Sequence, residues 1–297
     1  MKEARDVVVH GGMCHRDDFM AIGLLRLIGV IGPNTLVHRT NPTPSDLMNP
    51  DIPVVDVGGQ FDPALNNWDH HQHEENVKDE CAFSLLCKNT QVPSKFGFEG
   101  TFHDLWQAAP WYRAVNLRDN MGPDGLAKKF GLPFMPHEVT SPLEGFILGS
   151  IGDTDIFDHR WIELSAELLE SQAKRALEFR EKEEWLKENA KFFMLPHIPK
   201  HGPLCMLLAD QKGAFGINPY AAKNGPNGVK VILTATRDQR SPQWALFRLD
   251  AGVGIVDLTK LKDHPATTFV HPKGFLAIID QEFTGEELRE VAAQAIV

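Results

Sequence analysis

One stretch of the chain decides the fold: RDVVVHGGMCHRDDFMAIGLLRLIG, residues 5–29. Its first part, Asp6 to Val9, predicts a short buried strand that ends at His10 and two glycines. Apolar residues then recur at helical spacing, and Gly29 is placed to end that helix. A buried strand that leads straight into an amphipathic helix is typical of an α/β sheet.

Two further strands follow at a similar spacing. They are TLVHRT (35–40) and PVVDVGG (53–59), and the second again ends in an acid and paired glycines. This alternation of strands with helix predicts a doubly wound, mainly parallel α/β domain over residues 1–160.

The chain changes character at Trp161. From there to Leu195 it holds no glycine or proline, and its apolar residues predict one long amphipathic helix or two in tandem. We therefore assign residues 161–199 to a helical linker. The remainder is rich in strands and closes with a helix that Thr284 and Glu287 would cap, which predicts a smaller C-terminal α+β domain at 200–297.

The composition is that of a globular protein, since 42% of the 297 residues are hydrophobic and 24% are charged. The net charge of −10 argues against a protein that coats long DNA or RNA, but not against a short anionic substrate held by metal ions. The four cysteines form no CxxC pair, no secretory signal opens the chain, and no apolar run approaches the ~18 residues of a membrane span. We expect a cytoplasmic protein with reduced thiols and no membrane partner, with organellar targeting left open.

A second stretch, NNWDHHQHEE (66–75), crowds histidines and acids together. Each such residue alone has a simpler explanation, such as an aspartate that stabilises a helix N-terminus. His or Asp nevertheless recurs at the predicted strand ends, and the carboxyl ends of parallel strands face one crevice. The candidates that this crevice would collect are His10, His15, Asp17, Asp18, Asp56, Asp69, His70 and His71.

These residue types indicate the kind of metal site. Imidazoles and carboxylates without thiolates suit Mn²⁺, Fe²⁺, Co²⁺, Mg²⁺ or Zn²⁺ better than a structural zinc finger. The set is too large for one ion and suits two, which could clamp a phosphoryl group and activate water toward it. Asp56 is the candidate bridge between the ions because it ends a central strand.

The series HGGMCHRDD, VVDVGG and DHHQ resembles the DHH phosphoesterase superfamily, and most closely its MYG1 family of metal-dependent 3′–5′ exoribonucleases. FVHPKGF (269–275) is similar to a C-terminal motif of that family, so the matches run in order across the chain. Gly11, Asp18 and His73 depart from the family pattern, and a DNG-like motif has become RDNMG at 118–122. The chain therefore resembles a divergent member.

The resemblance implies a role for each matching residue. One ion would be held by His10, His15 and Asp56, and the other by Asp17, Asp56, His70 and Asp119. Asp153 in GSIGDTDIF competes with Asp119, which we favour. The implied catalytic residues are Asp69, His71 and Asp18, and those for substrate binding are His271, Gly274, Arg248 and Lys273.

The implied reaction is hydrolysis of a phosphodiester with two divalent ions, Mn²⁺ first and Mg²⁺ as an alternative. As a 3′–5′ exonuclease, the protein would release nucleoside monophosphates from single-stranded RNA or short oligonucleotides. Two other readings stay open: a small-molecule phosphohydrolase acting on pyrophosphate, pAp or a cyclic dinucleotide, and a non-catalytic, metal-stabilised binding protein. The oligomeric state is also open, a homodimer being one option.

Overall fold

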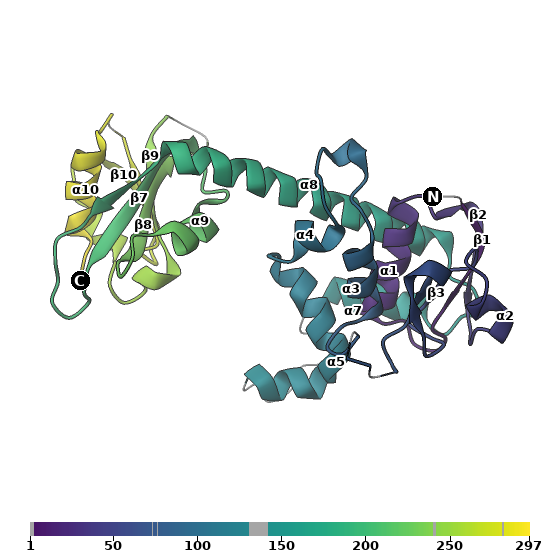
Figure 1. Cartoon of the computed structure of the whole chain (residues 1–297). Helices are drawn as coiled ribbons and strands as arrows, with labels where there is room; N and C mark the ends of the chain where they lie inside the picture. The colour runs from purple at the N-terminus through teal and green to yellow at the C-terminus, as the bar shows by residue number, and fades with distance from the viewer. Residues whose placement is uncertain (1–2, 73, 76, 131–141, 240–241, 281) are drawn as a thin grey trace. The chain divides into compact units, whose positions relative to one another are not determined.

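A five-stranded sheet forms the base of the N-terminal part of the chain (Figure 1). Its order is β2–β1–β3–β5–β4, and the neighbours are parallel except for the antiparallel pair β4–β5. The strands are β1 (Ala4–Val9), β2 (Ile31–Arg39), β3 (Val54–Val55), β4 (Phe61–Asp62) and β5 (Asn67–Trp68). The chain runs from β1 to β2 on one side and then to β3 on the other. A topological switch point, where α/β sheets bind ligands, therefore lies between β1 and β3.

The structure is a computed structural model that describes residues 3–72, 74–75, 77–130, 142–239, 242–280 and 282–297. The chain divides into two compact units, Met1–Leu177 and Glu178–Val297. This division falls inside the long helix α8 (His159–Asn189), so each unit contains a part of that helix.

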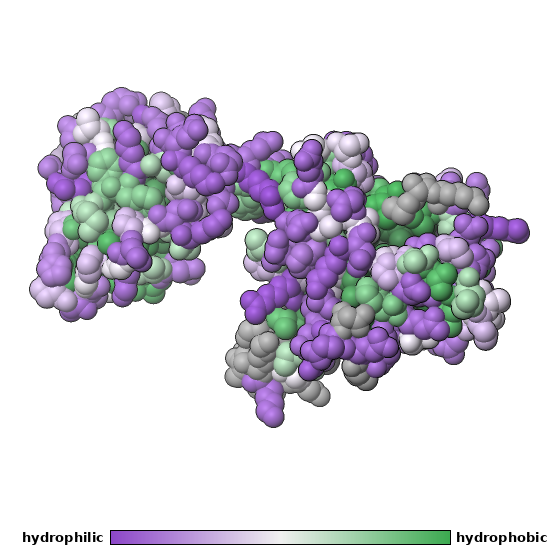
Figure 2. Space-filling view, viewed as in Figure 1, coloured by the Kyte–Doolittle hydropathy of each residue, from purple (hydrophilic) through white to green (hydrophobic). Residues whose placement is uncertain are grey.

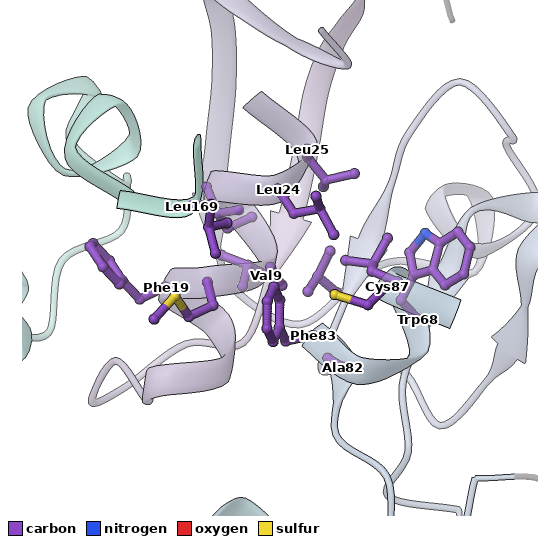
Figure 3. Packing of buried hydrophobic residues seen from close by; sticks show 14 of the residues in the cluster. Val9, Phe19, Leu24, Leu25, Trp68, Ala82, Phe83, Cys87 and Leu169 are labelled. Atoms are coloured by element: carbon purple, nitrogen blue, oxygen red, sulfur yellow. The ribbon is translucent and has the colours of Figure 1, made fainter. Parts of the chain in front are cut away.

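Helices cover the two faces of the first sheet unequally. On one face, Val7 and Val9 share a core with α1 (Arg16–Leu27), α3 (Ala82–Asn89) and the start of α8. Figure 3 shows this packing, in which Phe19, Leu24 and Leu25 of α1 lie beside Phe83 and Leu169. Val8 alternates to the other face, where it packs with Val54, Val57 and Leu47 of the short helix α2 (Pro44–Leu47).

Helix α1 packs closely against α8. A Cβ on Gly23 would lie 2.0 Å from Ser165 Oγ, so only glycine allows the two helices to approach this closely. The same Ser165 hydroxyl, which is fully buried, donates a hydrogen bond to the carbonyl of Phe19 over 2.7 Å. The remaining helices of this unit are α4 (Phe102–Trp106), α5 (Pro110–Phe130) and α7 (Pro142–Ile151), and α5 is kinked at Gly122.

The second unit is built on a six-stranded sheet with the order β10–β11–β9–β8–β7–β6. Only β7 and β8 are parallel neighbours within this sheet. The elements are β6 (Ala190–Met194), β7 (Leu204–Lys212), α9 (Ile217–Asn224), β8 (Lys230–Arg237), β9 (Trp244–Arg248), β10 (Thr267–Val270), β11 (Leu276–Ile279) and α10 (Gly285–Gln294). Thr284 and Glu287 form the predicted capping box of α10.

The fold class is the predicted mixture of a mainly parallel α/β sheet and a C-terminal α+β part. The predicted helix to Leu195 is wrong at its end, because α8 stops at Asn189 and residues 190–194 form strand β6. The strand predicted over 53–59 is likewise shorter, since β3 holds only Val54 and Val55.

Hydrophilic side chains cover most of the face shown in Figure 2, with apolar patches between them. All four cysteines are free and buried. Among the helices in the described ranges, none is long and apolar enough to cross a bilayer.

Candidate metal centre

The candidate ligands lie at the carboxyl ends of the central strands. His10 follows β1, Asp56 follows β3, and Asp69 follows β5 directly. His15 is the N-cap residue of α1, so Asp17 and Asp18 fall in the first turn of that helix. The switch point of the sheet and the start of α1 therefore meet at one place, as the alternation of strand and helix predicts.

Three groups of side chains offer ligand atoms that all lie within 4.8 Å of one another. The groups are His10, His15, Asp18 and Asp56; Asp56, His70 and His71; and His15, Asp17 and Asp119. Asp56 and His15 each belong to two of them, and Asp56 is the carboxylate of the two. The geometry also adds Asp18, a predicted catalytic residue, to the residues that could hold an ion.

His70 shows the spacing most clearly. Its Nε2 atom lies 3.2 Å from Asp56 Oδ1 and 3.0 Å from Asp119 Oδ2. These are hydrogen-bond distances, yet Nε2 makes no hydrogen bond, because the geometry aligns it with neither oxygen. Ligand atoms about 2.1 Å from one ion and at right angles to each other are separated by about 3 Å. Each of the two distances from His70 Nε2 therefore matches the separation of neighbouring ligand atoms around an ion.

Unpartnered buried atoms provide an independent test of whether these residues fit metal ions. Among the described residues, buried side-chain atoms without a hydrogen-bond partner gather here: His10 Nδ1, both carboxylate oxygens of Asp17, Asp18 Oδ1, Asp56 Oδ1, His70 Nε2 and Asp119 Oδ2. A buried polar atom left unpaired costs roughly 1–3 kcal/mol, and more if it is charged. Divalent cations would satisfy all seven atoms at once, so the residues fit the ions that the chemistry of the set implies.

The carboxylates repel one another strongly in the metal-free protein. Burial, together with the neighbouring Asp18 and Asp119, raises the pKa of Asp17 well above its ordinary value. Burial and the neighbouring Asp56 do the same to the pKa of Asp18, and burial with Asp17 raises the pKa of Asp56 to about 7. Burial opposes the charged form of His70, but Asp119 and Asp56 outweigh it and raise its pKa to about 10. The electrostatics of the site therefore favour the binding of positive charge.

Asp69 braces the loop instead of facing the ions. Its Oδ2 accepts a hydrogen bond from the amide of Gly59 over 2.6 Å, and its Oδ1 lies 2.7 Å from His71 Nδ1. Oδ1 also accepts from the amides of His70 and His71. Burial opposes ionisation of Asp69, but these bonds, led by that from His71, lower its pKa to about 2. Asp69 thus holds both histidines of the DHH triplet in place.

We expect Asp69→Asn to lower kcat by about 10- to 100-fold while most of the bound metal is retained, since residues that orient ligands have effects of this size. Steady-state kinetics and elemental analysis of the purified protein measure the two quantities. Asp62→Asn is the matched control, because Asp62 also accepts a backbone hydrogen bond in a nearby turn, from Ala64, but lies outside the site. An unchanged kcat in Asp69→Asn contradicts this role.

The backbone at Asp56 has an uncommon conformation. Its φ is 58°, in the left-handed region that few residues other than glycine adopt. Aspartate tolerates this region better than most residues, and the cost, of order 1–3 kcal/mol, is often found at functional sites. The turn aims Asp56 into the cluster, where its side chain is 1% exposed.

Several residues that position the site were not predicted from the sequence. Asn116 and Asn120 of α5 donate hydrogen bonds to the carbonyls of Asp79 and Glu80, which holds the helix that carries Asp119. Arg39, which is 4% exposed, donates to the carbonyls of Gly12 and Gly152 and so fixes the glycine turn after His10. A lone arginine at the end of a strand was the only signal for this contact.

The remaining predicted residues lie apart from these groups. Asp153 is exposed and belongs to none of the three. In the second unit, Arg248 donates to the carbonyl of Val256, and Lys273 is exposed. The ring of His271 contacts that of Phe275 at a tilt of 39°, with ring centroids 4.0 Å apart. Gly274 has φ 64°, and a Cβ there would lie 2.3 Å from Asp257 Oδ1. Substrate binding by His271, Gly274, Arg248 and Lys273 stays a prediction.

Known proteins match a segment of the chain that holds every member of the three groups except Asp119. Residues 6–90 match the model of the MYG1 exonuclease family, described as an uncharacterised protein family (UPF0160). The MYG1 exonuclease of Homo sapiens is 41% identical over 63 residues, which cover 21% of this chain and 16% of that protein. A MYG1 protein of Saccharomyces cerevisiae is 37% identical over 71 residues, 24% of this chain and 20% of its own. The matches thus span a fifth or less of the length of these relatives.

A solved structure, a pGpG-specific phosphodiesterase from Vibrio cholerae, covers 98% of this chain and 96% of its own. Its sequence identity is 11% and its TM-score is 0.27, and a likeness at this level carries no argument.

Proposed function

We propose that the protein is a metal-dependent phosphodiesterase. One observation carries the proposal: buried imidazole and carboxylate atoms without hydrogen-bond partners converge in three groups, which are linked through Asp56 and His15. Two divalent cations held by these residues would supply a water of lowered pKa and charge stabilisation for displacement at phosphorus. We assign His10, His15, Asp18 and Asp56 to one ion, and Asp17, Asp56, His70 and Asp119 to the other. Mn²⁺ is the first choice for both positions.

His71 is placed to handle the leaving group. Its Nδ1 is held by Asp69, so Nε2 of the same ring stays available, and the side chain is 57% exposed. The hydrogen bond to Asp69 raises the pKa of His71, so the ring keeps a proton near neutral pH better than a free histidine. A protonated imidazole can stabilise a phosphate oxygen that gains charge or give its proton to the departing alcohol.

The proposed substrate is single-stranded RNA or a short oligonucleotide, which the enzyme shortens from the 3′ end to nucleoside monophosphates. The MYG1 exonucleases matched by the N-terminal region support this class. The net charge of −10 favours short substrates, because long nucleic acids need an extended basic surface.

Incubation with Mn²⁺ and four substrates tests this function: a 5′-labelled RNA 20-mer, a 5-mer, pyrophosphate and cyclic di-AMP. We expect a ladder of 5′-labelled fragments from both RNAs, with nucleoside monophosphates as products and EDTA as the inhibited control. Hydrolysis of only pyrophosphate or cyclic di-AMP would overturn the exonuclease assignment. A purified protein that binds no metal and cleaves none of the four would overturn the phosphodiesterase assignment as well.

A further inference from the structure

An apolar pocket opens in the first unit, lined in part by helices that also carry candidate metal ligands. It has a volume of about 270 Å³. Its walls include Phe19 and Met20 of α1, Trp111 and Val115 of α5, and Leu168 of α8. Arg16 and Gln172 are the polar side chains among its lining residues. The proposed hydrolysis at phosphorus does not involve this pocket.

The pocket shares two helices with the metal centre. Arg16 stands between the candidate ligands His15 and Asp17 in the sequence, so the pocket begins where α1 begins. On α5, Val115 lies four residues before Asp119, which is about one helical turn or 6 Å along the axis. The remainder of a molecule whose phosphate binds the ions could therefore extend into this pocket.

The size and chemistry of the pocket define what it can hold. An apolar cavity of about 150 Å³ takes one benzene ring, so 270 Å³ is enough for a bicyclic aromatic ring but too small for a long chain or a helix. Nucleobases stack on aromatic side chains, and such contacts contribute about 1–3 kcal/mol per base. An indole, aliphatic walls and a few polar groups are the usual components of a site for a flat ring.

We propose that this pocket is the base subsite of the enzyme, which takes the nucleobase next to the scissile phosphodiester, with purines preferred by its size. Trp111 and the aliphatic walls would contact the faces of the base, and Gln172 would meet its polar edge. Arg16, at the start of α1, would lie beside the phosphate. The inference rests on the proposed phosphodiesterase function, since it takes the metal centre as the site of hydrolysis.

A substitution that fills the pocket tests the inference against a matched control. Leu168 and Leu164 both lie on α8, one turn apart, and are 37% and 38% exposed, but only Leu168 is among the residues lining the pocket. We expect Leu168→Trp to raise KM for the dinucleotide ApA by 10-fold or more. Hydrolysis of bis(p-nitrophenyl) phosphate, a diester without a base, should stay within twofold, and Leu164→Trp should leave both activities unchanged.

Leu143→Trp is the second filling variant, since Leu143 lines the pocket from α7 and is 67% exposed. Calorimetric titration with adenosine, which carries no phosphate, measures base binding without turnover. Unchanged KM and unchanged adenosine binding in both filling variants would overturn the base subsite while the phosphodiesterase function stands. If wild-type protein hydrolyses neither diester, the proposed phosphodiesterase function fails. In that case, binding of adenosine by the wild-type protein and its loss in Leu168→Trp would still support a base pocket.

Discussion

Asp56→Asn is expected to reduce hydrolysis of RNA on the order of 10³-fold or more, because it weakens the carboxylate that is shared by two ligand groups. An amide keeps the shape of the side chain but removes the negative charge that would bridge two cations. Asparagine also accepts the left-handed backbone at this position, φ 58°, so the fold should be retained. We therefore expect a folded protein that has lost bound metal and activity together.

The measurements are kcat/KM for the RNA 5-mer and the metal content of the purified protein. Asp153→Asn is the matched control, since Asp153 is an exposed aspartate outside the three groups. If Asp153→Asn loses activity and Asp119→Asn keeps it, Asp153 and not Asp119 is the ligand of the second ion. Full activity of Asp56→Asn would remove the shared carboxylate from the mechanism.

The second large effect concerns stability without metal. Asp56 has a pKa of about 7 in the fold, above its ordinary value, so between these values the folded state holds a proton that the unfolded state has released. Such a group stabilises the fold at low pH, and this contribution is lost as the pH rises to 7. From pH 5 to pH 7, Asp56 alone accounts for about 2–3 kcal/mol. The raised pKa values of Asp17, Asp18 and His70 act in the same direction.

Other ionisable groups change the stability of the fold in a different pH range or in the opposite direction. Asp69, whose pKa is lowered to about 2, loses its contribution only below pH 4, and the lowered pKa of His10 opposes the trend below about pH 6.5. We expect the melting temperature of the EDTA-treated protein to fall by roughly 5–10 °C between pH 5 and pH 8.

Differential scanning calorimetry with and without saturating Mn²⁺ checks this expectation. Metal binding should remove the fall, since it favours the ionised carboxylates. Asp18→Asn should raise the melting temperature of the metal-free protein at pH 8, whereas Asp46→Asn, at an exposed helix start, should not. A metal-free protein that is as stable at pH 8 as at pH 5 contradicts the electrostatic account.

Local patterns predicted the central part of the fold because strand and helix follow each other there without interruption. His10, Asp17 and Asp56 could be placed at one edge of the sheet since the carboxyl ends of parallel strands must share that edge. Long-range contacts could not be predicted in this way. The hydrogen bonds from α5 to Asp79 and Glu80 join segments about 40 residues apart, and no pattern within either segment predicts them.

The end of α8 is another such case. Residues 190–194 carry no glycine or proline, so helical spacing alone extends the helix through them. They form β6 because they pair with residues 205–209 of β7, and this non-local pairing outweighs local preference.

The unpartnered atoms around Asp56 also bear on how such a sequence persists over evolution. In a lineage with no use for the ions, neutral or apolar replacements at Asp17, Asp18 or Asp119 would make the polypeptide more robust, and mutation would soon supply them. A cluster of mutually repelling acidic residues is therefore expected to be lost through neutral mutation. If cations bind at the centre as we propose, selection for that binding accounts for the retained acids.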